Sequence, residues 1–360
     1  MNKKPFIHTF EAGENYYLYD VNKDVILKVE KDVYDYLKQV ENDKKINFNL
    51  EKDTKEKIDF LKRCGFLKSK RVKKTKHPST DNLQYYIDEK LNSLILQVTQ
   101  NCNLRCEYCI YSGTYKNRTH TNKRMSVELA IKAIDYLMEH SKQKNELGIS
   151  FYGGEPLLEF ELIKKVVEYS QKVGEGKDIY YNLTTNATLF NEDIIKFFVQ
   201  NKITVMISLD RDKETHDKYR KFNGNNRSTH EIVLKNAEYI KSKYPEYFKE
   251  HISFNCVVNT ESDYGAISDF ISTNKIIKDS SFLSSLINPN YCDNKETKVS
   301  KEYLFHKNYE RFLILLSKLG FVDEKKLSPL TFIESGLLED FRDEKNLVER
   351  IELPDECHHG

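Results

Sequence analysis

Three cysteines within eight residues, in the segment CNLRCEYCIY, constrain this chain more than any other feature. Cys102, Cys106 and Cys109 follow an apolar, strand-like run, and Tyr108 stands directly before the last cysteine. A loop with this spacing can supply thiolates to three irons of a [4Fe–4S] cube, which leaves the fourth iron free to bind another molecule. Tetrahedral zinc sites usually use paired Cys-x-x-Cys units or Cys/His sets, and His120, eleven residues on among polar loop residues, is not a convincing fourth ligand. The spacing therefore predicts an iron–sulfur cluster with one open iron.

The C-x-x-x-C-x-aromatic-C pattern resembles the signature of the radical S-adenosylmethionine (SAM) superfamily. The resemblance implies that Cys102, Cys106 and Cys109 are the catalytic, metal-binding residues and hold a [4Fe–4S] cluster whose open iron chelates the methionine part of SAM. In that superfamily an electron from the cluster splits SAM and yields a 5′-deoxyadenosyl radical. Tyr108 is expected to pack near the adenine. The alternative is a zinc knuckle, or three unrelated buried thiols.

Composition favours a soluble enzyme. The chain has 360 residues, 39% hydrophobic and 31% charged, with a net charge of +1, so it can bury one large core or two smaller ones. The balanced charge predicts neither a nucleic-acid nor a membrane partner. Because the first residues lack a signal peptide and no apolar run approaches ~20 residues, we expect a cytoplasmic location. Cysteines in that reducing compartment are expected as ligands or core thiols, and Cys64 and Cys256 are assigned to the core.

Residues 1–70 are predicted to form a small winged-helix-like α+β domain. Apolar runs at 6–10, 16–19 and 25–29 are typical of short strands, and helical patterns follow at 33–40 and around 58–64, where the second stops at Gly65. The segment 68–82 is basic, polar and nearly devoid of apolar residues. We therefore assign residues 71–89 to a basic linker.

A module of this kind ahead of a radical SAM signature resembles the peptide-recognition element of maturases that act on ribosomally made peptides. There a leader peptide adds a strand to the exposed edge of the sheet, and main-chain hydrogen bonds supply the affinity. Winged helices also bind DNA. The helices of this module carry many acidic residues among their lysines, which favours the peptide over the nucleic acid.

Residues 90–290 alternate strand and helix patterns. Strands are predicted at 94–98, 149–152, 179–183, 203–209, 252–258 and 282–287, with helices at 125–140, 158–173, 191–201, 228–243 and 263–274. Six strands each followed by a helix imply a parallel sheet, whose chemistry belongs at the carboxyl ends of the strands. The resemblance implies the specific architecture, an α/β fold with a partial (β/α)6 TIM-like barrel.

The second strand of this series runs into the sequence GGEP, which comprises Gly153, Gly154, Glu155 and Pro156. Two glycines let the backbone approach a ligand closely, and their free amide and carbonyl groups can hydrogen-bond an amino group. Alone, the sequence would be an ordinary strand-to-helix turn with proline at the helix start. One strand after the cysteines, it resembles the superfamily motif that binds the amino group of SAM, and these four residues are assigned to cofactor binding.

The resemblance assigns the ribose and carboxylate of SAM to polar residues after the next two strands, namely Thr185, Asn186, Ser208 and Arg220. An arginine suits a carboxylate because its planar fork can donate two hydrogen bonds. The alternative for Arg220 is an ion pair with Asp217 or Glu214 on a helix surface. Asp210 is expected to act as a substrate-binding or structural hydrogen-bonding residue.

Residues 291–360 are expected to form a helical extension, with a helix over 301–319, that leads into a truncated auxiliary iron–sulfur region. In the peptide-maturase and sulfatase-maturase branches, the barrel is followed by a cysteine-rich SPASM or twitch region that holds auxiliary [4Fe–4S] clusters. Cys357 stands where that region would begin, and it is assigned as an auxiliary-cluster ligand. One thiolate cannot hold a cluster, so we expect the sequence to stop inside that region.

These features together predict a SPASM-type radical SAM peptide maturase. Its expected partners are a Cys-rich precursor peptide with a leader sequence and an electron donor such as flavodoxin or ferredoxin, with no nucleic acid and no membrane. The expected product is a Cys thioether crosslink. One alternative is a sulfatase-type maturase that makes formylglycine. Another is a non-catalytic, metal-containing protein that binds peptide or nucleic acid.

Overall fold

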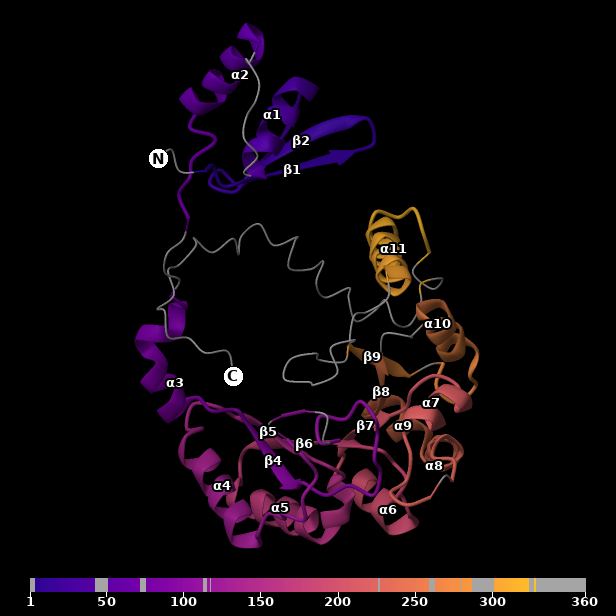
Figure 1. Ribbon diagram of the computed structural model, residues 1–360. Helices are drawn as coiled ribbons and strands as arrows, with labels where there is room; N and C mark the ends of the chain where they lie inside the picture. Colours follow the sequence, from indigo (N-terminus) through magenta and orange to yellow (C-terminus); the bar gives the residue numbers. More distant parts are fainter. Residues whose placement is uncertain are drawn as a thin grey trace. The chain divides into compact units, whose positions relative to one another are not determined.

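The computed structural model describes residues 4–42, 51–71, 76–112, 115–116, 118–225, 227–258, 263–278, 280–286, 301–323 and 327. The chain divides into two compact units, with the boundary between Thr80 and Asp81, and each unit has its own sheet (Figure 1). The predicted auxiliary ligand Cys357 lies outside the described residues. Of the helices in the described ranges, none combines the length and the apolar character needed to cross a membrane.

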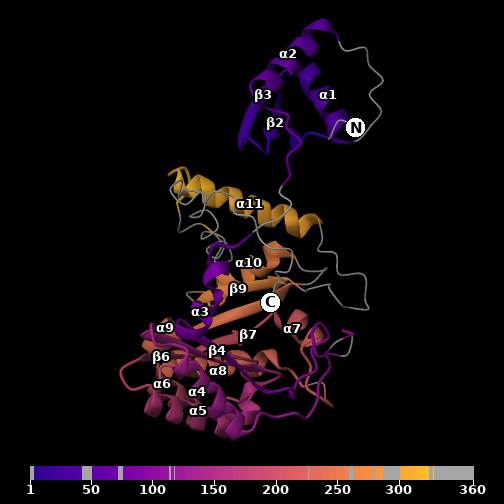
Figure 2. The ribbon, with the colours of Figure 1, turned by 90° about the vertical axis from the view of Figure 1, so that its left-hand side faces the viewer.

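The first unit is an antiparallel sheet with two helices. Strands β1 (Ile7–Ala12), β2 (Asn15–Asp20) and β3 (Val25–Val29) pair in the order β1-β2-β3, and α1 (Lys31–Glu41) and α2 (Lys52–Arg63) follow. These are the strands and helices that the sequence predicts. Figure 2 shows α1 and α2 beside the strands of this sheet. A small core of Ile7, Leu18, Val33, Leu37 and Ile58 joins both helices to the sheet. Apolar burial of this kind supplies most of the stability of so small a unit.

A buried carboxylate completes the first unit. Asp20, at the end of β2, is fully buried, and its Oδ1 accepts hydrogen bonds from the amides of Asn22 (3.0 Å) and Lys23 (3.1 Å). Its Oδ2 accepts from the amide of Leu67 at 2.6 Å, just beyond α2. One side chain thus caps the β2–β3 turn and ties it to the end of the helical region.

The second unit is built on a parallel sheet of six strands in chain order. The strands are β4 (Ser93–Thr99), β5 (Glu146–Gly153), β6 (Asp178–Thr185), β7 (Thr204–Ser208), β8 (Ile252–Val258) and β9 (Ser281–Leu286). The crossover helices include α4 (Val127–Glu139), α5 (Phe160–Val173), α6 (Glu192–Gln200), α8 (His230–Lys243) and α10 (Tyr264–Thr273). The predicted partial (β/α)6 barrel is confirmed.

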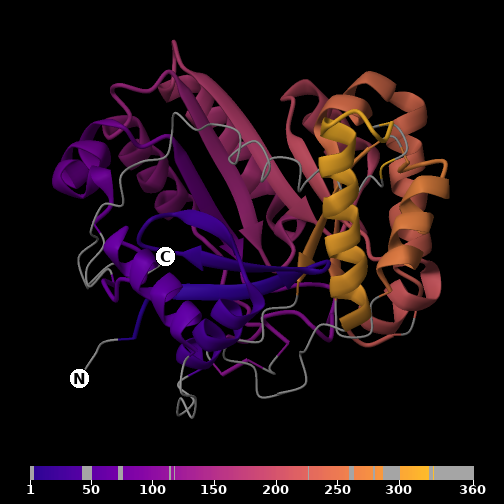
Figure 3. The ribbon, with the colours of Figure 1, turned by 90° about the horizontal axis from the view of Figure 1, so that it is seen from above.

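Alternation along the strands decides which face of this sheet is covered. Val205, Ile207 and Phe254 lie on the outer face and are buried under the helices. On the inner face, Ile95 is 70% exposed, and the rings of Tyr152 and Tyr180 are also exposed. Figure 3 shows the strands as a curved sheet with helices along its outer side. Among the described residues of this unit, no helix packs on the concave face in the way the outer helices do, and the loops at its carboxyl end can build a site.

Three helices and two 3-10 segments were not predicted. They are η1 (Pro78–Asn82), α3 (Leu83–Glu89), η2 (Pro156–Glu159), α7 (Lys213–Tyr219) and α9 (Pro245–His251). The assignment of residues 71–89 to a linker was therefore wrong over its last part. Helix α3 has only seven residues and none of them is buried, so its apolar residues form too short a pattern to distinguish it from the polar segment before it. The predicted helix at 301–319 is present as α11 (Lys301–Lys318), which packs against α10 through Tyr303 and Tyr264.

Replacing Asp20 by alanine is expected to destabilise the first unit by roughly 1–3 kcal/mol, because buried amides lose their acceptor. Hydrogen exchange of the β2 amides in the full chain measures this local stability. Asp35→Ala is the matched control, since Asp35 is exposed on α1. Equal protection in both variants would contradict the role of Asp20.

Candidate active site

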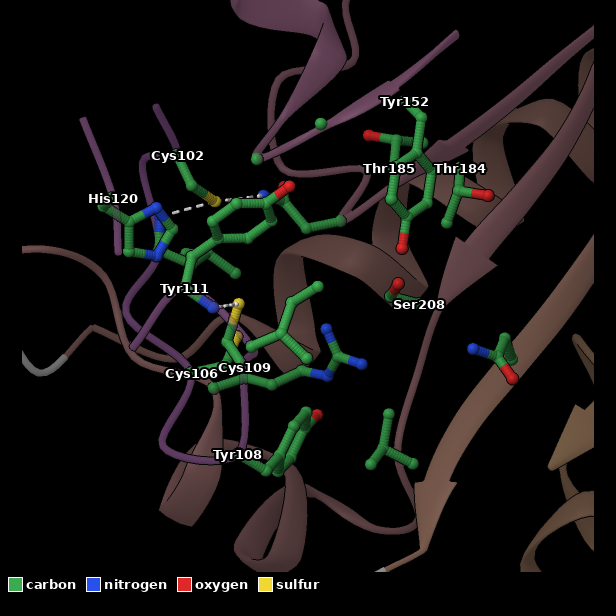
Figure 4. A pocket seen from close by; sticks show the side chains of 18 of the residues that line it. Cys102, Cys106, Tyr108, Cys109, Tyr111, His120, Tyr152, Thr184, Thr185 and Ser208 are labelled. Carbon is green, nitrogen blue, oxygen red and sulfur yellow. Dashed lines mark hydrogen bonds between the residues drawn. The ribbon is translucent and has the colours of Figure 1, made fainter. Parts of the chain in front are cut away.

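The cysteine loop follows β4 and opens into a cavity of about 400 Å³ at the carboxyl end of the sheet. The cavity wall includes residues from the ends of five strands, β5 through β9, and from the cysteine loop that follows β4. Of the predicted site residues it brings together Cys102, Cys106, Tyr108, Cys109, Gly153, Gly154, Thr185, Asn186, Ser208 and Arg220. Figure 4 shows the three cysteines on one side and Thr184 and Ser208 on the other. The position matches the expectation that chemistry lies at the strand ends.

The spread of the three thiols decides what they can hold. All three cysteines are free, and their sulfur atoms do not all lie within 4.8 Å of one another. Two sulfurs on one zinc ion are at most about 4.6 Å apart, because each Zn–S bond is about 2.3 Å. The loop as folded therefore does not fit one tetrahedral zinc, whereas thiolates of a [4Fe–4S] cube bind different irons.

The thiols are partly buried, which affects their protonation. Burial raises the pKa of Cys102 to about 12 and that of Cys106 to about 11, and it also raises the pKa of Cys109. The metal-free thiols are therefore protonated at neutral pH, and ligation of iron releases protons.

Hydrogen-bond donors already point at two of these sulfurs. The amide of Leu104 donates to Cys102 Sγ (3.3 Å), and the amide of Tyr111 donates to Cys109 Sγ (3.4 Å). From the end of β6, Asn186 Nδ2 lies 3.8 Å from Cys102 Sγ. Donors to ligand sulfurs stabilise the thiolate form and tune a cluster that binds there.

Gly153 and Gly154 are required by close packing. A Cβ on Gly153 would lie 2.1 Å from the Thr99 carbonyl oxygen, and a Cβ on Gly154 would lie 2.1 Å from that of Asn101. Gly153 also has a φ of 140°, which favours glycine. The amide of Gly154 donates to Thr99 O at 3.0 Å. The glycines thus let the end of β5 pass directly against the start of the cysteine loop, and they line the cavity as bare backbone.

The Glu155 carboxylate lies inside the wall, where it connects two strand ends. It accepts hydrogen bonds from the Leu157 amide (3.1 Å), the Thr185 hydroxyl (2.7 Å) and the Asn186 amide (2.8 Å). Burial raises the pKa of Glu155 to about 7, although these three hydrogen bonds favour the ionised form and lower the pKa. Pro156 is buried and starts η2, and neither residue is among those that line the cavity. Their direct contact with a cofactor stays a prediction.

Asn186 links β6 to the cysteine loop. Its Nδ2 donates to Asn103 Oδ1 at 2.8 Å, and its Oδ1 accepts from the amide and hydroxyl of Thr188. Asn103 Nδ2 in turn donates to the Thr188 hydroxyl at 2.8 Å. The side chain is held on both sides, so its position beside Cys102 is fixed.

Arg220 is buried at the end of α7, and its partner is neither Asp217 nor Glu214. It donates from Nε to Asp210 Oδ2 at 2.9 Å and from Nη2 to Oδ1 at 3.4 Å. Burial disfavours both charges, yet each partner keeps the other ionised, so the pKa of Asp210 is lowered and that of Arg220 is raised. The alternative of a helix-surface ion pair with Asp217 or Glu214 was therefore wrong, and the bidentate donors predicted for SAM contact a carboxylate of the protein itself.

Several residues of the cavity wall were not predicted. They are Leu104, Ile110, Tyr111, Tyr115, His120, Tyr152, Thr184, Asn255 and Ser285. Thr184 could have been found because it directly precedes the predicted Thr185 at the end of β6, and Asn255 because it is a polar residue at an inward position of a mostly apolar strand. The loop residues carry no such signal. His120 returns to the cavity only because its segment pairs back, with its amide donating to Tyr111 O at 3.0 Å.

The two remaining described cysteines differ from each other. Cys256 is buried in β8, as predicted. Cys64 is exposed after α2, so its assignment to the core was wrong. It closes the helix with its backbone, which requires no burial of the side chain.

Residues 96–264 match the Radical SAM superfamily. This segment contains β4 through β8 and every predicted cofactor residue of the barrel. The match confirms the radical SAM fold predicted from the cysteine motif, and it supports a [4Fe–4S] cluster and SAM as the cofactors.

Curated relatives and solved structures agree with this assignment. The chain is 31% identical over 163 residues to a cysteine-type anaerobic sulfatase-maturating enzyme of Clostridium novyi, and the aligned region covers 44% of this chain and 42% of that protein. It is 26% identical over 186 residues to the radical SAM cyclopropyl synthase TigE of Paramaledivibacter caminithermalis, covering 49% and 37%. Native anSMEcpe with bound AdoMet and Cp18Cys peptide superposes with a TM-score of 0.52 and 26% identity, covering 64% and 62%. The chain spans about two fifths of the length of the curated relatives it matches.

Replacing Glu155 by glutamine is expected to flatten the pH dependence of barrel stability. The folded pKa of about 7 exceeds the ordinary value of 4.5, so between these values the folded state binds more protons than the unfolded state. Wild-type stability is therefore expected to fall by roughly 3 kcal/mol relative to the variant as pH rises through this window.

Urea denaturation of the metal-free protein from about pH 5 to about pH 8 measures this difference. The comparison with the variant removes the contribution of His216, whose pKa burial lowers to about 3 and which acts in the opposite direction. Parallel curves for the two proteins would contradict the assignment.

Proposed function

We propose that this chain, whose barrel is a radical SAM domain, modifies a ribosomally made, Cys-rich precursor peptide by forming a Cys thioether. The observation that carries this proposal is the cavity in which three separated thiols face bare glycine backbone and uncharged polar strand ends. The relatives support a peptide substrate, since one is a sulfatase-maturating enzyme and the solved anSMEcpe holds a peptide.

Cys102, Cys106 and Cys109 would hold a [4Fe–4S] cluster, which would supply the electron for reductive cleavage of SAM to methionine and a 5′-deoxyadenosyl radical. The backbone of Gly153 and Gly154 offers hydrogen bonds to the ammonium group of SAM. Thr185, Asn186 and Ser208 bind the ribose and the carboxylate. Tyr108 contributes its ring beside the adenine, and Arg220 offers the donors that Asp210 leaves free. Glu155 and Pro156 act through the residues that they position.

Forming a thioether removes two hydrogens from the peptide. The radical takes one hydrogen atom from a carbon of the peptide, and the thiol proton and one electron leave as the sulfur bonds to that carbon. The electron needs an acceptor, for which an auxiliary [4Fe–4S] cluster with Cys357 among its ligands is the candidate. Flavodoxin or ferredoxin is the proposed electron donor for the radical SAM cluster.

The first unit is proposed to bind the leader of the precursor. Strand β3 is an edge strand that pairs with β2 alone within the described sheet, and a hollow of about 450 Å³ lies between β3 and α2. Val29, Val33 and Leu61 line the hollow, and Phe60, 58% exposed, stands at its side. An extended peptide can add to such an edge through main-chain hydrogen bonds while its side chains enter the hollow.

Formylglycine formation on a sulfatase is the second candidate function. It is favoured by the sulfatase-maturating relatives, which include a serine-type enzyme of Bacteroides thetaiotaomicron that is 37% identical over 125 residues. That chemistry uses the same radical but needs no leader-binding unit. A sulfatase gene adjacent to this one would support it, and a small Cys-rich reading frame there would support thioether formation.

The triple substitution of Cys102, Cys106 and Cys109 by alanine is expected to abolish cluster assembly and SAM cleavage, because no thiolate remains in the loop. The measurement is 5′-deoxyadenosine formation by anaerobically reconstituted, dithionite-reduced protein given SAM. Cys64→Ala, which removes an exposed thiol of the first unit, is the matched control and should retain full activity. Zinc in place of iron in the wild type would favour the metal-containing binding protein.

Phe60→Ala is expected to weaken leader binding roughly tenfold, because an exposed aromatic anchor is lost. The probe is a synthetic peptide that spans the leader encoded by the adjacent reading frame, and the dissociation constant is measured by titration calorimetry. SAM cleavage should not change.

Phe10→Ala is the matched control for this variant, because Phe10 stacks on Tyr17 and is not among the residues that line the hollow. Equal losses in the two variants would refute the assignment of the leader to the hollow beside β3.

A further inference from the structure

The buried carboxylate of Asp210 joins three separate parts of the barrel. It follows β7, is 2% exposed and accepts hydrogen bonds from the Tyr108 hydroxyl of the cysteine loop and from Arg220 at the end of α7. Its Oδ1 also accepts from the Val257 amide of β8 at 3.0 Å. We call Asp210, Arg220, Tyr108 and the Val257 amide the Asp210 network.

Backbone pairing attaches the same loop to the segment after α7. The amide of Arg105 donates to Lys221 O at 2.7 Å, and the amide of Glu107 donates to Tyr219 O at 3.0 Å. An antiparallel bridge joins Leu104 and Phe222. The cysteine loop therefore runs alongside residues 219–223, so the position of Arg220 and the position of the thiols depend on each other.

The ion pair is oriented with respect to the cavity. Arg220 lines the cavity together with Cys106 and Cys109, whereas Asp210 is not among the lining residues. The Arg220 guanidinium also lies 5.4 Å from the centre of the Tyr108 ring. Tyr108 stands between Cys106 and Cys109 in the sequence. The positive end of the pair thus faces the thiols and the negative end lies behind it.

We propose that Asp210 and Arg220 have two separable roles toward the cluster: they hold the cysteine loop in place, and their charges set its reduction potential. This inference rests on the proposed function, because it takes the three cysteines to hold a [4Fe–4S] cluster. Reduction adds one negative charge, so the nearby positive charge of Arg220 favours the reduced state and the charge of Asp210 opposes it. In a buried site, solvent screens these effects little.

Opposite shifts of the potential are the expected signature. In Asp210→Asn the arginine charge loses its counter-charge, so the midpoint potential should rise. In Arg220→Gln the positive charge is gone, so the potential should fall. Arg220→Lys keeps the charge but not the fork, and its potential should stay nearest to that of the wild type. Lys213→Gln is the matched control, because Lys213 is exposed on α7 and pairs with Glu231 at the surface.

The experiment is a redox titration of the reconstituted proteins, followed by the electron paramagnetic resonance signal of the reduced cluster. Hydrogen exchange of the loop amides at 103–107 in the metal-free proteins measures the holding role. Exchange should accelerate in Asp210→Asn, Arg220→Gln and Arg220→Lys and stay unchanged in Lys213→Gln. This second readout applies even where a variant takes up no iron.

Each outcome bears on one part of the inference. Absence of any iron–sulfur cluster in the wild type would overturn the proposed function and this inference with it. Suppose that the wild type holds a cluster. If the midpoint potentials of Asp210→Asn and Arg220→Gln then both shift in the same direction, or do not shift, only the electrostatic role is overturned. Unchanged exchange in those two variants would overturn the holding role.

Discussion

The separation of three sulfur ligands on one short loop is the constraint on which the site depends. The loop has no helix or strand of its own to hold Cys102, Cys106 and Cys109 apart, so the neighbouring strand ends must do it. On one side, the glycine backbone after β5 and the Asn186 side chain after β6 contact the start of the loop. On the other side, the Asp210 network and residues 219–223 hold its middle. The barrel thus prepares the site before any metal is bound.

Two buried carboxylates, Glu155 and Asp210, connect the strand ends and the cysteine loop. Their surroundings shift their pKa values in opposite directions. Glu155 receives three hydrogen bonds but no countercharge, so burial prevails and raises its pKa to about 7. Asp210 is similarly buried, but it also faces the positive charge of Arg220, and its pKa is lowered. A carboxyl group that titrates near neutral pH therefore lies beside Gly153 and Gly154, and an ion pair lies beside Cys106 and Cys109.

The regular part of this structure was predictable, because period-2 and helical patterns record which face of each element is buried. All six barrel strands and the three strands of the first unit lie where the sequence placed them. Helix α3 escaped prediction because it is exposed, and α7 because its seven residues are mostly polar. The cysteines and the GGEP turn were found because spacing and residue type are local signals. The pairing of Arg220 with Asp210 and Tyr108 was not found from the sequence, because it depends on where three distant segments meet.

The wall opposite the cysteines limits what the cavity can accept. Thr184, Ser208, Asn255 and Ser285 line it, and Ser285 donates to Asn255 Oδ1 at 3.1 Å. Of the described lining residues, Arg220 alone carries a permanent charge, and Asp210 balances it. Hydroxyl and amide groups suit the uncharged backbone and the thiol or hydroxyl of a peptide, since a charged side chain would enter without a partner. Both candidate functions meet this condition equally. What would separate them physically is the first unit, because the proposed capture of a leader uses the β3 edge and the adjoining hollow, whereas formylglycine formation on a sulfatase does not require them.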